Sequence, residues 1–232
     1  MENVNPRKHD TYAFLETAGN VFLWLMGGLY VRGSHRVPTV GAVMLVSNHA
    51  SYLDPVAIGV AAPRRVLFMT KAEIFDIKVF AWLLDGVDCF PVRRKVADLT
   101  AFKTAMFHLK TGRCLCIFPE GTRSPNGQLQ LAEAGAAALA IKTKVTLIPV
   151  YVHGSHRMLG LNKSLHRGRI DVAFGEPFVI DKTLDKDAAA AAVMAAIQHV
   201  AETFEQDSAQ CIRPHLFTKK SERALFPAVE LT

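Results

Sequence analysis

The 232-residue sequence has only four cysteines, no Cys-x-x-Cys pair and no uncharged apolar run that would cross a membrane by itself. In a chain of this size, scattered cysteines indicate buried thiols in a reducing compartment rather than a disulfide framework. The uncharged run over residues 21–31 is shorter than the about 20 residues that a spanning helix needs. No small-residue cleavage pattern follows the N-terminus, so we expect no secretory signal. The cysteines are Cys89, Cys114, Cys116 and Cys211.

Acidic residues are in a minority: 21 Asp and Glu stand against 27 Lys and Arg, which gives a formal charge of +6. This excess favours an anionic partner, which could be nucleic acid, an anionic membrane or a phosphorylated substrate. The basic residues are scattered and no nucleic-acid-binding motif accompanies them, so we expect no nucleic-acid partner. We also find no internal repeat and no linker, and an apolar content of 50% suffices for one core.

The segment from Asp10 to Tyr30 is predicted to form an amphipathic helix. It either packs on the core or lies in a membrane interface with Trp24 and Tyr30 as anchors, and we favour the interface. We therefore expect residues 1–40 to be a membrane-interface helix and linker. The apolar stripe of this helix comprises Phe14, Ala18, Val21, Phe22, Leu25 and Leu29.

From Gly41 onward, short apolar runs alternate with helical patterns. This alternation predicts a single α/β domain over 41–208, with a mixed, largely parallel central sheet flanked by helices, followed by a basic tail over 209–232. The expected strands are AVMLVS, RVLFMT, VDCFPV, CLCIF, VTLIPVYV and RIDVAFG. The expected helices open at Asp54-Pro55 and cover about 72–84, 96–111, 132–143 and 187–206.

Polar residues follow most of these strands. Ligands of open α/β sheets bind beyond the carboxyl ends of the strands, so these residues are expected to share one rim. A histidine, carboxylates and cations gathered there suit general-base catalysis beside a phosphate. In chain order the residues are Asn48, His49, Asp54, Lys71, Arg93, Arg94, Lys95, Glu120, Gly121, Thr122, Arg123, His153 and His156.

His49 and Asp54 are five residues apart and would not meet on one continuous helix, so His49 must precede the helix. Asp54 before Pro55 is typical of an N-cap, and its only role would then be structural. Alternatively, one oxygen caps while the other accepts from the His49 ring and fixes its tautomer. No Gly-x-Ser-x-Gly elbow occurs, which favours direct base-assisted transfer over an acyl-enzyme.

Four blocks in this order resemble the glycerolipid acyltransferases, a family centred on 1-acylglycerol-3-phosphate acyltransferase: SNHASYLD, FPVRR, FPEGTRS and LIPVYVHGS. The segment TKAEIF, which contains Lys71, also resembles that family. Any single block is weak, but four in order across residues 46–155 are a specific signal. The chain departs from the pattern where members often carry Phe-Lys-x-Gly, because residues 131–135 read LAEAG and the lysine is missing.

The resemblance implies that His49 is the general base and that Asp54 orients it. It implies that Arg93 and Arg123 bind the acceptor phosphate, with Lys71 as a second phosphate or coenzyme A contact. The loop that contains Glu120, Gly121 and Thr122 would bind glycerol hydroxyls, and its backbone N–H groups would serve the oxyanion. Glu120 could instead only pair with Arg123.

The function implied is transfer of a fatty acyl group from acyl-CoA or acyl-carrier protein to a lysophospholipid hydroxyl, foremost 1-acylglycerol-3-phosphate, giving phosphatidic acid. The alternatives are another lysolipid acceptor, hydrolysis of the thioester, or a non-catalytic phospholipid-binding membrane protein. We expect no cofactor beyond the thioester co-substrate and no metal site. The expected location is the cytoplasmic face of a membrane, as a peripheral or monotopic protein.

Overall fold

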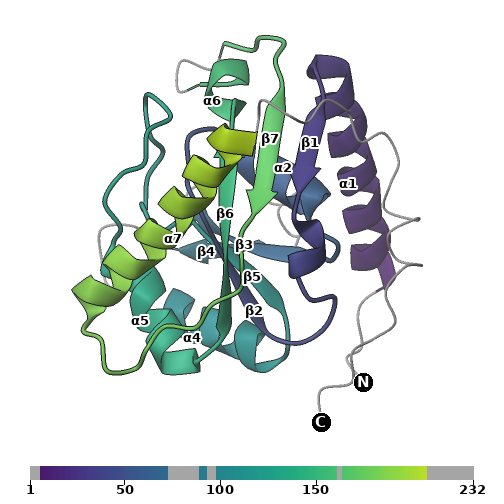
Figure 1. Ribbon diagram of the computed structural model, residues 1–232. Helices are drawn as coiled ribbons and strands as arrows, with labels where there is room; N and C mark the ends of the chain where they lie inside the picture. The colour runs from purple at the N-terminus through teal and green to yellow at the C-terminus, as the bar shows by residue number, and fades with distance from the viewer. Residues whose placement is uncertain (1–5, 73–88, 93–97, 161–163, 208–232) are drawn as a thin grey trace.

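The computed structural model describes residues 6–72, 89–92, 98–160 and 164–207, and Figure 1 shows them as one sheet between two layers of helices. The seven strands of this sheet lie in the order β1-β7-β6-β2-β5-β3-β4. The strands are β1 Leu29–Arg32, β2 Val43–Ser47, β3 Val66–Lys71, β4 Phe90–Val92, β5 Cys114–Ile117, β6 Thr146–His153 and β7 Ile170–Phe174. The helices are α1 Pro6–Met26, η1 Ser34–Arg36, α2 Asp54–Ala61, α4 Leu99–Lys110, α5 Ala134–Thr143, α6 Ser155–Met158 and α7 Lys186–Asp207.

Strand β2 lies at the centre of the sheet. It pairs in parallel with β5 on one side and with β6 on the other, and all five of its residues are buried. Strand β7 pairs antiparallel with β6 and parallel with the edge strand β1. This arrangement confirms the predicted mixed, largely parallel sheet, in which short apolar runs are covered on both faces.

Alternate residues of β2 point into two separate cores. Val43 and Leu45 pack with α1 and α2, whereas Met44 and Val46 pack with α4, α5 and α7. Because successive strand side chains face opposite sides, the continuous run AVMLVS serves both layers at once. The sheet therefore holds the carboxyl end of β2 rigidly at one rim of the domain.

The N-terminal helix ends earlier than predicted. It stops at Met26, and β1 begins at Leu29, so Tyr30 belongs to the sheet. Gly27 and Gly28 explain the break, since both have positive φ angles, which a helix does not continue. The ring of Tyr30 lies under the guanidinium of Arg169, 3.8 Å from its carbon, and not in a position to anchor a membrane helix.

Helix α1 packs against α2 through one face only. Tyr12 and Leu23 are buried there, and Gly19 brings the helix close to Val56. Four large apolar residues are exposed instead, three of them from the predicted stripe, so that stripe is not the buried face. They are Phe14, Val21, Trp24 and Leu25. No helix among the described residues is both long and apolar enough to cross a membrane.

Six of the strands and four of the helices lie where the sequence predicts them. The helix expected over 72–84 and the basic tail after residue 208 lie outside the described residues. Cys114 and Cys116 are buried thiols, as expected, and burial raises the pKa of Cys114 to about 12.

Candidate active site

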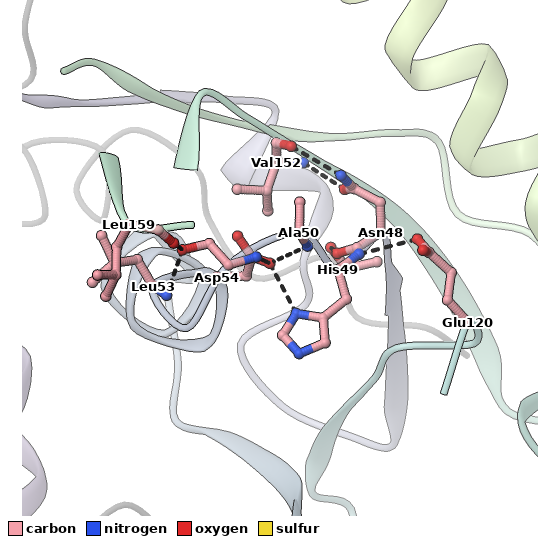
Figure 2. Close-up of polar contacts among 10 residues, drawn as sticks. Asn48, His49, Ala50, Leu53, Asp54, Glu120, Val152 and Leu159 are labelled. Carbon is pink, nitrogen blue, oxygen red and sulfur yellow. Dashed lines mark hydrogen bonds and ion pairs between the residues drawn. The ribbon is translucent and has the colours of Figure 1, made fainter. Parts of the chain in front are cut away.

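The site begins where β2 ends. The side-chain amide of Asn48 donates to the carbonyl oxygen of Val152 at 2.9 Å and accepts from the Val152 N–H at 2.8 Å. This pair of hydrogen bonds prolongs the β2–β6 ladder by one side chain, as Figure 2 shows. It fixes the backbone from which His49 leaves the sheet.

His49 and Asp54 form a buried pair, with 2.8 Å between Nδ1 of the ring and Oδ2 of the carboxylate. The same Oδ2 accepts from the backbone N–H groups of Ala50 and Ser51, both at 2.7 Å (Figure 2). A carboxylate fixed by two backbone donors is an acceptor for Nδ1–H, so the neutral ring carries its proton on Nδ1. The Nε2 atom is then left as a proton acceptor for chemistry.

Asp54 does not cap the helix, contrary to the structural alternative. Helix α2 begins at Asp54 itself with Pro55 in its first turn, and its N-cap residue is Leu53. The Asp54 carboxylate turns back toward the preceding turn, because Ala50 and Ser51 supply its donors. Its Oδ1 atom is buried and has no hydrogen-bond partner among the described residues.

The ring of Phe118 stacks on the His49 imidazole, with 4.0 Å between the centroids and 19° between the planes. Phe118 immediately follows β5, the neighbour of β2 in the sheet. The imidazole is thus held by a carboxylate at its edge and by an aromatic ring on its face. The sequence analysis did not assign Phe118 to the site, although it is the first residue of the FPEGTRS block.

Glu120 also contacts the turn over residues 48–54, which contains the predicted base His49 and which we call the catalytic turn. Its Oε1 accepts from the backbone N–H of His49 at 3.1 Å, and only 4% of the residue is exposed (Figure 2). Burial raises the pKa of the Glu120 carboxyl to about 7, against the opposing effect of the hydrogen bond from His49. Hydrogen bonds from the side chain and backbone of Gln130 also lower this pKa, but burial outweighs them. Near neutral pH this carboxyl therefore exchanges a proton.

Gly121 turns the chain with φ of +66°, and a Cβ at this position would lie 2.5 Å from the carboxylate carbon of Glu133. A positive φ of this size favours glycine. The N–H of Gly121 donates to the carbonyl oxygen of Phe118 at 3.1 Å, so this amide is paired within the loop. The N–H of Ser124 donates to the carbonyl oxygen of His49 at 2.7 Å and closes the loop onto the catalytic turn. Thr122 is exposed.

Arg123 does not pair with Glu120 as the competing interpretation required. Its guanidinium carbon lies 3.6 Å from the ring centroid of Tyr52, a residue of the turn between His49 and Asp54. Glu120 instead accepts from the His49 backbone. The two residues of the FPEGTRS block therefore contact two different parts of the same catalytic turn.

The other predicted site residues are placed less fully. Lys71 ends β3 and pairs in register with Val92 of β4. Arg93, Arg94 and Lys95 lie outside the described residues. His153 ends β6, and the His156 ring packs against Gly127, where a Cβ would approach the ring carbon Cε1 to 2.6 Å. His156 thus supports the loop over 121–128, and burial lowers the pKa of both histidines.

A family model described as acyltransferase matches residues 28–153, which include β1, the catalytic turn and the FPEGTRS loop. The chain belongs to the acyltransferase family. The acyltransferase resemblance drawn from four sequence blocks is therefore confirmed.

Two bacterial relatives carry the name 1-acyl-sn-glycerol-3-phosphate acyltransferase. The protein of Streptococcus pneumoniae is 31% identical over 173 residues, which cover 73% of this acyltransferase and 63% of the relative. The protein of Bacillus subtilis is 30% identical over 167 residues, which cover 72% and 81%. The crystal structure of the 1-acyl-sn-glycerophosphate acyltransferase PlsC from Thermotoga maritima shares the fold, with a TM-score of 0.72, 22% identity, and coverage of 87% and 84%.

Proposed function

We propose that this acyltransferase moves a fatty acyl group from an acyl thioester, acyl-CoA or acyl-carrier protein, to the free hydroxyl of 1-acylglycerol-3-phosphate, giving phosphatidic acid. The observation that carries the proposal is the 2.8 Å contact between His49 Nδ1 and Asp54 Oδ2. It leaves Nε2 as the basic atom of a ring held on two sides. The names of the two bacterial relatives support this acceptor.

In the proposed reaction, the acceptor hydroxyl attacks the thioester carbonyl while Nε2 of His49 takes its proton. The Asp54 carboxylate stabilises the imidazolium that forms. The tetrahedral intermediate then collapses, the carbon–sulfur bond breaks, and the imidazolium returns the proton to the leaving thiolate. Base catalysis of this kind contributes about 10²–10⁴-fold.

Arg123 is proposed to bind the acceptor phosphate, because a guanidinium presents N–H groups in a planar fork that matches phosphate oxygens. Its guanidinium stacks on Tyr52, which belongs to the same turn as the proposed base. Arg93 and Lys71 remain proposed as further contacts to phosphate or coenzyme A, and Glu120 to a glycerol hydroxyl. The Glu120 carboxyl is buried beside the His49 backbone and has a pKa of about 7.

We also propose that the exposed face of α1 rests on a membrane surface, with the enzyme as a peripheral protein. Trp24 and Leu25 are half exposed at the end of this helix. Strand β1 starts a few residues after α1 ends, beside the start of β7. Because β7 runs antiparallel to β6, the start of β7 lies next to the end of β6, at the same rim as the proposed base. The end of α1 therefore lies at this rim. An apolar helix end beside the rim would let an acyl chain reach the site without crossing much water.

The test is turnover by the purified protein. Acyl-CoA or acyl-carrier protein is mixed with a panel of lysolipids, and release of free thiol is followed together with the lipid product. The proposal predicts thiol release that depends on 1-acylglycerol-3-phosphate, with phosphatidic acid as product. Release of free fatty acid without acceptor would identify a hydrolase, and no turnover with any donor would support a lipid-binding protein.

A further inference from the structure

Tyr52 and Arg123 come from two different loops that meet at the catalytic turn. Tyr52 lies between His49 and Asp54, and Arg123 lies in the FPEGTRS loop after β5. Their side chains stack, with the guanidinium carbon 3.6 Å from the centre of the Tyr52 ring. Neither residue is buried: Tyr52 is 41% exposed and Arg123 is partly exposed. This contact is therefore not a consequence of core packing.

The separation of 3.6 Å restricts how the guanidinium lies. A carbon-to-centroid distance this short favours a guanidinium that lies parallel over the ring. A face-to-face stack uses the π face of the guanidinium and leaves its N–H groups pointing outward in its plane. Those N–H groups are the ones that bind phosphate oxygens in a forked geometry.

The platform under Arg123 is itself rigid. The backbone N–H of Ser51 is held by Asp54, and the Ser51 hydroxyl accepts from the N–H of Leu53 at 3.1 Å and donates to the carbonyl oxygen of Leu159 at 2.6 Å. Tyr52 thus lies between two residues whose backbone is fixed. On the other side, the bond from Ser124 N–H to the His49 carbonyl fixes the residue after Arg123.

We infer that Tyr52 is a positioning residue for acceptor recognition. Its ring holds the Arg123 guanidinium at a set distance from His49, so that an acceptor whose phosphate binds Arg123 presents its hydroxyl to the base. The inference rests on the proposed function, because it takes the ligand of Arg123 to be the acceptor phosphate. It adds a residue whose side chain does no chemistry but whose aromatic face sets the affinity for the acceptor.

The test compares Tyr52→Phe, Tyr52→Leu, Arg123→Gln and the double variant Tyr52→Leu/Arg123→Gln in the full-length enzyme. KM for 1-acylglycerol-3-phosphate, KM for acyl-CoA and kcat are measured, with thermal unfolding as a control for folding. Tyr52→Leu is expected to raise the acceptor KM about two- to tenfold, the worth of a cation–π contact at a partly exposed site. Tyr52→Phe, which keeps the ring, should leave the acceptor KM near the wild-type value.

In the Arg123→Gln background, Tyr52→Leu should have no further effect on the acceptor KM, because the cation that the ring positions is gone. Equal effects of Tyr52→Leu in both backgrounds would overturn the inference, as would failure of Tyr52→Phe to keep the affinity. If Arg123→Gln raises the acceptor KM and Tyr52→Leu does not, the inference fails while the proposed function stands. If Arg123→Gln leaves the acceptor KM unchanged, the phosphate role of Arg123 fails and the inference fails with it.

Discussion

The catalytic turn and helix α1 differ in which side chains they bury and which they expose. In the turn over residues 48–54, four polar side chains are buried, and three of them bond to backbone groups: those of Asn48, Ser51 and Asp54, with His49 as the fourth. On helix α1, at least half of the surface of each of Phe14, Trp24 and Leu25 is exposed. Buried hydrogen bonds fix atoms in place, whereas exposed apolar side chains provide a surface that another apolar phase can cover. We expect this contrast to separate the proposed chemistry from the proposed access to lipid.

The largest effect is expected where the buried region performs proton transfer. His49→Ala should lower kcat by about 10²–10⁴-fold, because the acceptor hydroxyl loses its base. The thermal midpoint should change little by comparison, and thiol release at saturating substrates measures the loss. His199→Ala, on the exposed side of α7, is the matched control and should keep full activity. Turnover of His49→Ala near the wild-type rate would contradict direct base-assisted transfer.

A smaller effect is expected where an aromatic ring supports the base without taking part in chemistry. Phe118→Leu should lower kcat about two- to tenfold, since aromatic stacking is worth roughly 0.5–1.5 kcal/mol beyond area burial. Phe118→Tyr keeps the stacked ring and should retain most of the rate. The measurement is kcat at saturating donor and acceptor for both variants. Equal losses in both would show that volume, and not the stack on His49, matters at this position.

Glu120 makes the stability of the buried region depend on pH. Its pKa is about 7 in the folded protein against 4.5 ordinarily, so the folded state binds more protons between these values. The contribution of Glu120 to the free energy of unfolding is fully present below about pH 4.5 and is lost as the pH rises through about 7. Glu120→Gln removes the titration while keeping an acceptor for the His49 N–H. The unfolding midpoint of the variant should therefore fall less than that of the wild type between pH 5 and pH 7.5, and parallel curves would refute the raised pKa.

The sequence predicted the central fold well because its strands are continuous apolar runs that are buried on both faces. Strand β1 was not predicted, because its apolar residues continue the helical pattern of α1 after only two glycines. The signal was present in Gly27 and Gly28, which have positive φ angles and end the helix. The periodicity of apolar residues does not distinguish a helix end from a short edge strand.

The sequence predicted that His49 and Asp54 come together, and their side chains are in contact at 2.8 Å, whereas their catalytic roles stay predictions. The sequence did not indicate Phe118, Tyr52 or the anchoring role of Asn48, which depend on contacts between strands distant in sequence. Residues of this kind act through the face of a ring or a backbone contact. No spacing rule within one segment encodes such contacts, so they emerge only from the sheet order.

Changes to the exposed face of α1 are expected to have the smallest effect on turnover itself. They also test most directly whether this helix and the catalytic turn have separate roles. Deleting the whole segment is a poor test, because Tyr12 and Leu23 belong to the core and β1 belongs to the sheet. The triple variant Phe14→Ser/Trp24→Ser/Leu25→Ser changes exposed side chains only. It should keep the wild-type thermal midpoint and the wild-type turnover of a short-chain, water-soluble thioester.

The same variant should lose binding to vesicles, because an interfacial helix is held by its apolar face and by attraction of nearby cations to anionic lipid. Sedimentation with vesicles that contain anionic lipid measures this loss, and turnover of long-chain substrate in those vesicles should fall in parallel. The matched control is Ala13→Ser/Ala18→Ser, which adds hydroxyls at two other exposed positions of the helix and should bind as the wild type does. Wild-type sedimentation of the triple variant would mean that the exposed face of α1 does not hold the enzyme on lipid. The access route would then have to begin from another part of the chain.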